Sequence, residues 1–145
     1  MRLNLGVGRE GLQSWVNVDI TPRMCVDTVW DLDVTPWPWA DCEATEIKAF
    51  DILEHLDDMV AVMDECWRVL KPGGLMTVRV PVAGGPNHYD DPTHKRGFTP
   101  ASFNYWCPNT QEHDPYPLLY GRGTWELEGC HTEWANLLFT LRRLP

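Results

Sequence analysis

The sequence predicts an α/β fold in which a mostly parallel sheet is followed by an antiparallel hairpin. Short apolar runs fill the first half of the 145-residue chain, and one helix with clear 3.6-residue periodicity follows the fourth run. Two runs of alternating polarity close the chain. Since this length lies near the commonest domain size, residues 1–145 are expected to form a single domain.

Four strands are predicted before the helix, each ending near an acidic residue or a glycine. They are Arg2 to Val7, Trp15 to Ile20, Val26 to Leu32 and Glu46 to Ile52. The helix contains Met59, Val60, Met63, Cys66, Trp67 and Leu70 at helical spacing, with Asp57 or Asp58 as its cap. The run "KPGG" ends the helix, and "LMTVRVP" forms the fifth strand, parallel to the fourth.

The second half of the chain is less regular. Pro81 to Phe98 has no periodicity and reads as a long functional loop, after which Thr99 is expected to cap a short helix, "ASFNYW". A second irregular stretch runs from Cys107 to Gly123. Thr124 to Thr132 and Asn136 to Arg143 are predicted to pair as an antiparallel hairpin.

Charge and cysteine content exclude several classes of protein. With 12 basic and 21 acidic residues the net charge is −9, which would repel nucleic acid, and the terminal "LRRL" is interpreted as a solvated strand edge. Five scattered cysteines without a CxxC pair indicate reduced thiols, not a disulfide framework. No long apolar segment or signal peptide is found, so a cytoplasmic protein without membrane contact is expected.

A glycine-rich loop follows the first predicted strand. Gly6, Gly8 and Gly11 spell GxGxxG, but the helix that binds a pyrophosphate is missing, since only about eight residues precede Trp15 and a helical crossover needs a dozen. Asp19 lies 13 positions after Gly6, where a dinucleotide site expects about 20. Both departures disfavour a nicotinamide-dependent oxidoreductase. A ligand with ribose and adenine but no phosphate, such as S-adenosylmethionine, fits better, although such a loop also occurs without a ligand.

Six segments occur in the order seen in class I S-adenosylmethionine-dependent methyltransferases. They are "LNLGVG", "WVNVDI", "DLD", "AFDILEHL", "ECWRVLKPGG" and "PNHYDDPTHKRGFTPASF". The chain resembles a compact member of the type 11 group of that family over roughly Leu3 to Trp106. The resemblance implies a Rossmann-like, mostly parallel seven-stranded sheet with an antiparallel C-terminal hairpin, and S-adenosylmethionine as cofactor. The first crossover helix is reduced or missing.

The resemblance also implies roles for individual residues. Leu5, Gly6 and Gly8 would lie along the methionine moiety, Asp19 would bind the ribose, and Asp31 with Leu32 would border the adenine. Asp51 would hold the amino-acid part of the cofactor, because a carboxylate suits an ammonium or sulfonium neighbour. Asp31 is equally suited to ending its strand as a cap.

Substrate-side residues are expected on the long loop and before the helix. His94 and His55 are the candidate proton acceptors and Arg96 a further catalytic candidate, while His55 could instead pack against the helix start. The loop also supplies His88, Tyr89, Asp91 and Phe98. His88, Asp90, Asp91 and His94 could be read as metal ligands, but their spacing matches no defined site and no metal is predicted.

The expected partners are the cofactor and a methyl acceptor, which is a small molecule, a glycan or a protein group. Because the chain starts at the first strand, the N-terminal helices that often cover the cofactor are expected to be absent. A homo-oligomer or a mobile loop would then cover the site. The alternative is a catalytically silent protein of this fold that binds the cofactor or serves as a partner subunit.

Overall fold

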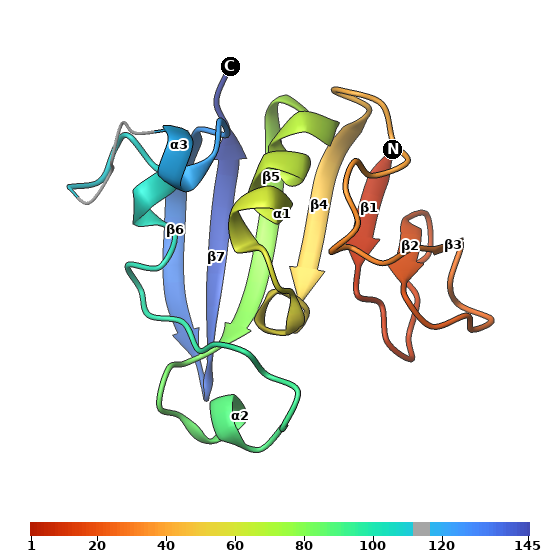
Figure 1. The fold of residues 1–145 in the computed structure, drawn as a ribbon, viewed down its shortest axis with the longest axis horizontal. Helices are drawn as coiled ribbons and strands as arrows, with labels where there is room; N and C mark the ends of the chain where they lie inside the picture. The colour runs from red at the N-terminus through yellow and green to blue at the C-terminus, as the bar shows by residue number, and fades with distance from the viewer. Residues whose placement is uncertain (112–116) are drawn as a thin grey trace.

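A seven-stranded sheet forms the centre of the protein (Figure 1), as seen in a computed structural model that describes residues 1–111 and 117–145. The strand order is β3-β2-β1-β4-β5-β7-β6. The five strands β1 to β5 are parallel, and β7 is antiparallel to both β5 and β6. The expected Rossmann-like sheet with an antiparallel C-terminal hairpin is confirmed. The strands are β1 Arg2–Leu5, β2 Val16–Asp19, β3 Thr28–Val29, β4 Ala44–Phe50, β5 Leu70–Pro81, β6 Trp125–Glu133 and β7 Asn136–Arg143.

The first three strands are shorter than predicted, and local turns explain where β1 and β3 end. β1 ends at Leu5 because Gly6 has a φ of +64°, in the left-handed region. β3 keeps only two of the residues predicted between Val26 and Leu32. The Val26 N–H turns back to the Arg23 carbonyl, and the Asp31 carbonyl accepts the N–H of Val34, so the chain bends on both sides of β3.

Helix α1, Met59–Val69, confirms the predicted crossover between β4 and β5. Asp58 caps it, because its Oδ1 accepts the N–H groups of Val60 and Ala61 at 3.1 and 3.0 Å. Of the two aspartates proposed as the cap, Asp58 therefore has that role. The chain enters β5 directly at Leu70, five residues before the predicted fifth strand begins.

The other helical segments are single turns. They are η1 Leu53–His55, α2 Pro86–Tyr89, η2 Asn104–Trp106 and α3 Pro117–Tyr120. α2 lies inside the stretch predicted to be a loop. The helix predicted over 101–106 is reduced to η2, and Thr99 does not cap it, since the Thr99 N–H donates to the Ser102 hydroxyl at 2.8 Å. Residues 112–116 of the irregular stretch Cys107 to Gly123 lie outside the described part of the chain.

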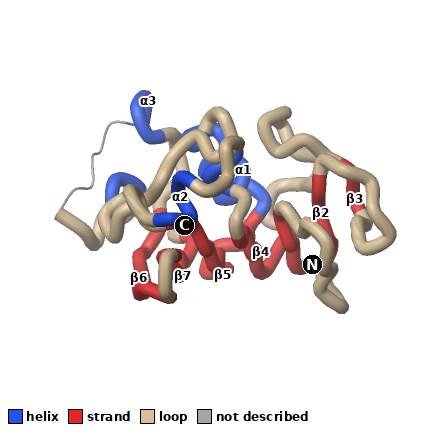
Figure 2. The backbone as a smooth tube through the Cα atoms, turned by 90° about the horizontal axis from the view of Figure 1, so that it is seen from below, coloured by secondary structure: helices blue, strands red, loops and turns tan. Residues whose placement is uncertain are grey.

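The helices lie on one side of the sheet, and the other side is open (Figure 2). Along β4, Ile47 and Ala49 are buried under the covered face, whereas Lys48 and Phe50 alternate with them and are half-buried. Parallel sheets usually have helices on both faces. Here the open face carries charged side chains, and the Lys48 ammonium lies 4.2 Å from the centroid of the Phe50 ring.

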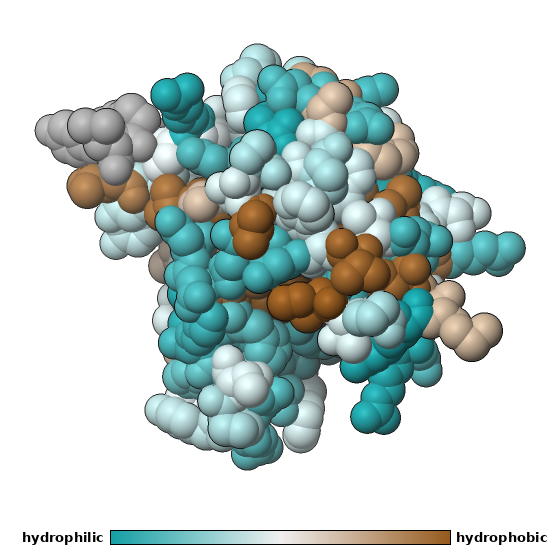
Figure 3. Space-filling view, turned by 45° about the vertical axis from the view of Figure 1, so that its right-hand side comes forward, coloured by the Kyte–Doolittle hydropathy of each residue, from teal (hydrophilic) through white to brown (hydrophobic). Residues whose placement is uncertain are grey.

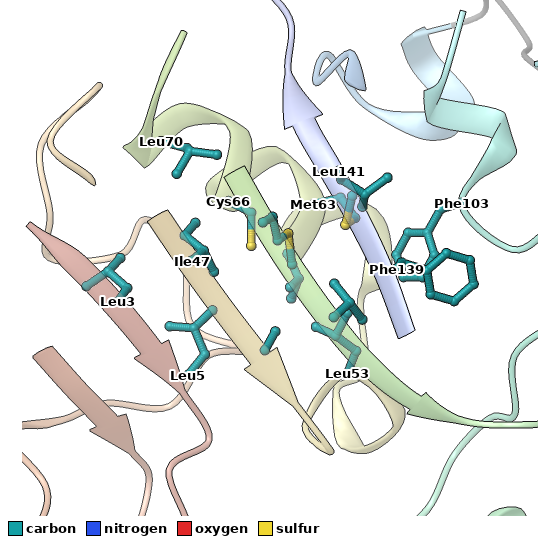
Figure 4. Close-up of a cluster of buried hydrophobic side chains, with 14 of the residues drawn as sticks. Leu3, Leu5, Ile47, Leu53, Met63, Cys66, Leu70, Phe103, Phe139 and Leu141 are labelled. Carbon is teal, nitrogen blue, oxygen red and sulfur yellow. The ribbon is translucent and has the colours of Figure 1, made fainter. Parts of the chain in front are cut away.

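The hydrophobic core lies between the covered face and α1 (Figure 4). On the side of β7 no long helix covers the sheet within the described residues; the loop after Phe98 does so instead. Phe103 is fully buried and packs its ring 4.6 Å from that of Phe139. Fully buried core residues include Leu3, Ile47, Leu53, Met63, Leu70 and Leu141.

The terminal "LRRL" does not lie at the edge of the sheet, because β7 is paired with β5 on one side and β6 on the other. Arg142 pairs with Glu128 on the open face, but Arg143 is only 6% exposed. Its guanidinium lies 4.0 Å from the Trp67 ring centroid and donates to the Leu70 carbonyl at 2.6 Å. The interpretation as a solvated edge is therefore wrong for Arg143, because the strand alternation places it on the covered face.

Two expectations from composition can be compared with the structure. All five cysteines are free, as predicted, and Cys66 and Cys107 are buried. Burial raises the pKa of the Cys107 thiol to about 12, so this group stays protonated near neutral pH. None of the helices in the described residues has the length and apolar character needed to cross a bilayer.

Glu65 ties α1 to the segment 30–43, which forms one wall of the site described below. Its carboxylate accepts the Trp37 N–H at 2.6 Å and two guanidinium N–H groups of Arg68 at 2.7 Å. Burial alone would raise the pKa of the Glu65 carboxyl, but these hydrogen bonds outweigh it and hold the pKa below the ordinary value of 4.5.

We expect Glu65→Gln to lower the free energy of unfolding by about 1–3 kcal/mol at neutral pH, because hydrogen bonds to the charged carboxylate are lost. A lowered folded-state pKa gives stability that is present above 4.5 and is lost as the pH falls through the folded-state pKa. Urea unfolding at several pH values should show this loss in the original protein and a flatter curve in the variant. Glu126→Gln, at an exposed position of β6, is the control for removing one charge; equal curves for both variants would contradict the assignment.

Candidate active site

Two neighbouring pockets lie at the carboxyl edge of the parallel strands, where ligands of such sheets bind. The first, here called the Asp19 pocket, has a volume of about 270 Å³. The second, the His94 pocket, has a volume of about 500 Å³. The turn after β4 separates them, since Ile52 and His55 line the first and Asp51 and Glu54 line the second.

The glycine loop after β1 folds back onto β2. Val7 donates its N–H to the Val18 carbonyl at 3.0 Å, and Gly8 donates its N–H to Asp19 Oδ2 at 2.9 Å. Gly6 and Gly8 both have φ values in the left-handed region, +64° and +63°. A Cβ on Gly6 would lie 2.6 Å from the Ile52 side chain, whereas one on Gly8 would meet open space. The Ile52 side chain therefore fills the space that a Cβ at position 6 would need.

Asn17 holds this loop in the place of a crossover helix. Its side-chain oxygen accepts the Leu12 N–H at 2.8 Å and the Asn4 amide at 3.0 Å. Its side-chain nitrogen donates to the Leu12 carbonyl at 3.1 Å and to Asp27 Oδ2 at 3.0 Å. The loop from 6 to 15, all of it described, contains no helix, so the predicted loss of the first crossover helix is confirmed.

Asp19 ends β2 with its carboxylate at the first pocket. Oδ2 accepts the Gly8 N–H and Oδ1 accepts the Thr21 N–H at 2.8 Å. A carboxylate offers about four acceptor positions, so about two remain for a ligand. Asp31 lines the same pocket, and its Oδ1 accepts the Asp33 N–H at 3.0 Å, which stabilises the turn after β3.

Five apolar side chains also line the Asp19 pocket. Trp30 is fixed by a hydrogen bond of 3.0 Å from its Nε1 to the Val34 carbonyl. The space-filling view shows hydrophobic side chains gathered in a band across an otherwise mostly hydrophilic face (Figure 3). The apolar lining residues of the pocket are Ile20, Trp30, Leu32, Ile52 and Leu56. Apolar walls with carboxylates at the rim suit a flat ligand that carries hydroxyl groups.

The turn between the pockets is held by the neighbouring strand. Asp51 has a φ of +54°, and its Oδ1 accepts the Arg79 Nε–H at 3.0 Å, while Arg79 Nη2 also pairs with Oδ2. The chain then enters the 3₁₀ turn Leu53–His55. Lys95 from the long loop donates its N–H to the Glu54 carbonyl at 2.8 Å. These contacts fix the loop after β5 against the turn after β4.

Glu54, His94 and Asp91 converge at the boundary of the two pockets. Glu54 is only 1% exposed, and its Oε1 lies 3.8 Å from His94 Nε2. Asp91 Oδ2 lies 3.9 Å from the same nitrogen. The rings of His94 and His55 meet edge to face with centroids 4.7 Å apart. The long loop therefore brings an imidazole to a buried carboxyl that is distant in sequence.

This environment shifts the pKa values of two groups at the boundary. Burial raises the pKa of the Glu54 carboxyl to about 7, and Asp51 adds to the increase. Burial and the neighbouring His94 both lower the pKa of His55, which favours the neutral imidazole. Hydrogen bonds from Thr93 lower the pKa of Asp91. The boundary thus combines a carboxyl that can be protonated near neutral pH with a neutral imidazole.

The structure brings together only part of the set predicted from the sequence. Five of the predicted residues line the Asp19 pocket: Gly6, Asp19, Asp31, Leu32 and His55. Asp51 and His94 line the other pocket.

Leu5, Gly8 and Arg96 line neither pocket. Leu5 is buried in the core, at 1% exposure. Gly8 lines a groove beside Lys48 and Arg79 on the open face of the sheet. Arg96 Nη2 donates to the Asp57 carbonyl at 3.0 Å, which anchors the long loop near the start of α1.

Several lining residues were not predicted. Ile52 and Leu56 belong to the quoted segment "DILEHL", and their apolar character could have indicated a pocket wall beside Asp51. Glu54 belongs to the same segment, but its sequence position beside His55 does not indicate that it is buried. Lys95 and Trp30 gave no signal, because a lysine in an irregular loop and a tryptophan after a strand have many other roles.

The family model described as "Methyltransferase domain" matches residues 5–78, which is half of the chain. The chain belongs to this methyltransferase domain family. The matched segment holds the glycine loop, Asp19, Asp31 and the turn with Glu54 and His55. The resemblance identified from the sequence is therefore confirmed at the level of the family.

One relative of this methyltransferase-family chain comes from Mycolicibacterium smegmatis and is named a probable S-adenosylmethionine-dependent methyltransferase. The two sequences are 28% identical over 100 residues. The match covers 65% of this chain but only 39% of the length of the relative.

Solved structures share the fold. A SAM-dependent methyltransferase from Archaeoglobus fulgidus superposes with a TM-score of 0.69 at 16% identity, covering 97% of this chain and 85% of that one. The 1,6-didemethyltoxoflavin-N1-methyltransferase of Burkholderia thailandensis, solved with bound 1,6-didemethyltoxoflavin and S-adenosylhomocysteine, gives a TM-score of 0.66 at 14% identity. That superposition covers 99% of this chain and 71% of the Burkholderia chain. At these identities the likeness shows the fold alone.

Gly6 and Gly8 allow a matched test of the loop geometry. Both have a left-handed backbone, so Gly8→Ala should cost about 1–2 kcal/mol of stability from the backbone alone. Gly6→Ala should cost more, because its Cβ would also overlap Ile52. Adding Ile52→Ala to Gly6→Ala should give a loss smaller than the sum of the two single losses. Urea unfolding gives the free energy of unfolding of the original protein, the three single variants, including Ile52→Ala, and the double variant. Equal losses for the two glycine variants would contradict the packing of Ile52 on Gly6.

Proposed function

We propose that this protein transfers the methyl group of S-adenosylmethionine to an acceptor bound in the His94 pocket. The observation that carries the proposal is the pair of adjacent pockets divided by a single turn. Except for Lys95, the first pocket is lined by residues of the matched family segment. Family membership and the name of the Mycolicibacterium relative support S-adenosylmethionine as the cofactor. We also propose that residues 1–145 act as one methyltransferase domain.

In the proposed complex the adenosyl group occupies the Asp19 pocket. The free acceptor positions of Asp19 bind the ribose hydroxyls, and Asp31 with Leu32 border the adenine. Of the glycine loop, Gly6 contributes backbone beside the methionine moiety, whereas Leu5 and Gly8 line neither pocket and support the turn from behind. Ile52 packs against Gly6, and we place both residues in contact with the methionine moiety.

Asp51 lies at the junction with the second pocket, in a position for the positive amino-acid part of the cofactor. Its ion pair with Arg79 already neutralises part of its charge. We therefore assign Asp51 to orienting the cofactor through its hydrogen-bonding oxygens, and not to supplying a full unpaired charge.

Methyl transfer from a sulfonium is an in-line displacement on a group that is already activated. The protein mainly has to align the acceptor atom with the methyl group and exclude water. If the acceptor atom still carries its proton, a base must remove that proton, and His94 or His55 at the pocket boundary would do so. Arg96 acts as a positioning residue for the loop that carries His94, through its contact with Asp57.

We expect Asp19→Ala to weaken binding of S-adenosylhomocysteine by about 1–3 kcal/mol, the scale of a hydrogen bond to a charged group. This corresponds to a rise in Kd of about 5- to 150-fold in isothermal titration calorimetry. Asp19→Asn retains one acceptor oxygen and should give a smaller effect. Asp90→Asn, in the His94 pocket, is the control and should leave Kd unchanged. Unchanged affinity in Asp19→Ala would refute the ribose assignment.

We expect His94→Ala to bind S-adenosylhomocysteine normally and to transfer methyl groups about 100-fold more slowly, because it loses a proton acceptor at the acceptor pocket. Transfer of tritium from labelled S-adenosylmethionine to components of a lysate and to small-molecule and glycan panels measures turnover. His131→Ala, on an exposed part of β6, is the control.

Loss of both binding and turnover in His94→Ala would place this loop in the cofactor site or the fold. Cofactor binding by the original protein without transfer to any component would instead indicate a silent cofactor-binding protein.

A further inference from the structure

Three side chains with metal-ligating atoms converge at the boundary of the two pockets. One ligand atom each of Glu54, His55 and His94 lie within 4.8 Å of one another. Glu54 and His55 come from the turn after β4, and His94 comes from the loop after β5. The set differs from the one considered in the sequence, because only His94 is common to both. We infer that these residues bind a divalent transition-metal ion, with Asp91 beside it.

The polar groups of this cluster do not satisfy one another. His94 Nε2 lies 3.8 Å from Glu54 Oε1 and 3.9 Å from Asp91 Oδ2, and both distances exceed the range of a hydrogen bond. Glu54 is only 1% exposed, and its Oε2 has no hydrogen-bond partner among the described residues. A bound ion would supply a partner for this buried oxygen and compensate its loss of water. The gap therefore has room and unused ligand atoms for an ion.

The distances suit a small cation after a modest closure. A Zn²⁺ ion with bonds of about 2.1 Å at tetrahedral angles separates its ligand atoms by about 3.4 Å. The separation between His94 Nε2 and Glu54 Oε1 is 3.8 Å, so these two side chains need to approach by about 0.4 Å. The three ligand atoms lie within 4.8 Å of one another, so no pair needs to close by more than about 1.4 Å. Two imidazoles with a carboxylate are ligands that divalent transition metals accept, with positions left open for a substrate.

Thr93 orders the surrounding hydrogen bonds as a metal site requires. Its hydroxyl donates to Asp91 Oδ1 at 2.7 Å and lies 2.9 Å from His55 Nδ1. Because the hydroxyl proton is directed to Asp91, His55 Nδ1 carries a proton and donates to the hydroxyl oxygen. The lone pair of the neutral His55 ring is then on Nε2. Metal-ligating histidines commonly donate their other ring N–H in this way.

The position of the ion would add a Lewis acid to the acceptor side of the proposed reaction. Glu54, Asp91 and His94 line the His94 pocket, while His55 lines the Asp19 pocket. With the ion bound, the ring nitrogens of His55 and His94 that coordinate it could not also accept a proton. An acceptor hydroxyl bound to the ion would instead have a lowered pKa and release its proton to water, and it would be oriented toward the cofactor. Metal binding itself does not depend on methyl transfer and can be tested without it.

The test is titration of the full chain, first treated with a chelator, with Zn²⁺ in isothermal titration calorimetry. We expect one equivalent to bind, and His94→Ala and Glu54→Gln each to weaken binding at least about tenfold. Co²⁺ bound to the original protein should give the visible bands of nitrogen and oxygen ligation, without thiolate charge-transfer bands. His131→Ala, outside the cluster, should bind Zn²⁺ as tightly as the original protein.

Absence of Zn²⁺ binding, equal binding by all variants, or Co²⁺ spectra with thiolate bands would overturn the inference. Each variant is also titrated with S-adenosylhomocysteine, and its circular dichroism is recorded. A variant that keeps the original fold and cofactor affinity but loses the ion locates the site at these residues. Failure of cofactor binding in the original protein would count against the proposed function and leave the metal result to be judged separately.

Discussion

The hydrogen bonds of the Asn17 side chain are the constraint on which the site depends. Asn17 stands in the middle of β2, is 7% exposed, and uses both its oxygen and its nitrogen on neighbouring segments. A loop that connects two parallel strands without a helix has no regular partner for its backbone. By bonding both the N–H and the carbonyl of Leu12, Asn17 supplies one. The glycine turn and Asp19 consequently keep a fixed separation across β1 and β2.

The rest of the sheet also has few helices to cover it. α1 is the one crossover helix of more than a single turn among the described residues, and it covers the centre of one face. The opposite face relies on alternation instead, with Lys48, Arg79 and Arg142 set between buried neighbours. Because strands buried on one side only can alternate polar and apolar residues, this sheet combines parallel pairing with a pattern usual for antiparallel sheets.

Much of this arrangement was predictable from local sequence. The periodicity around Met63, the acidic cap before Met59, and the two alternating C-terminal runs are local signals, and each corresponds to an observed element. The short span between Gly6 and Trp15 predicted the missing helix for the same reason. Such patterns depend on neighbours within a few residues, which a sequence shows directly.

Other features depend on contacts between distant segments and could not be predicted. Arg143 is buried because its strand alternation places it over Trp67, 76 residues earlier. Glu54 meets His94 only because the long loop returns across the turn after β4. No periodicity in that loop indicates its path. Glu54 and His94 are therefore brought together by a loop whose path the sequence does not indicate.

The turn Leu53–His55 has a consequence for how the two ligands meet. Adjacent residues on it face different pockets, so any shift that helps one occupant alters the surroundings of the other. Thermodynamic linkage makes such an influence mutual. If one molecule raises the affinity for a second, the second raises the affinity for the first by the same factor. In the proposed complex this single 3₁₀ turn is the element through which binding in one pocket would change the affinity of the other.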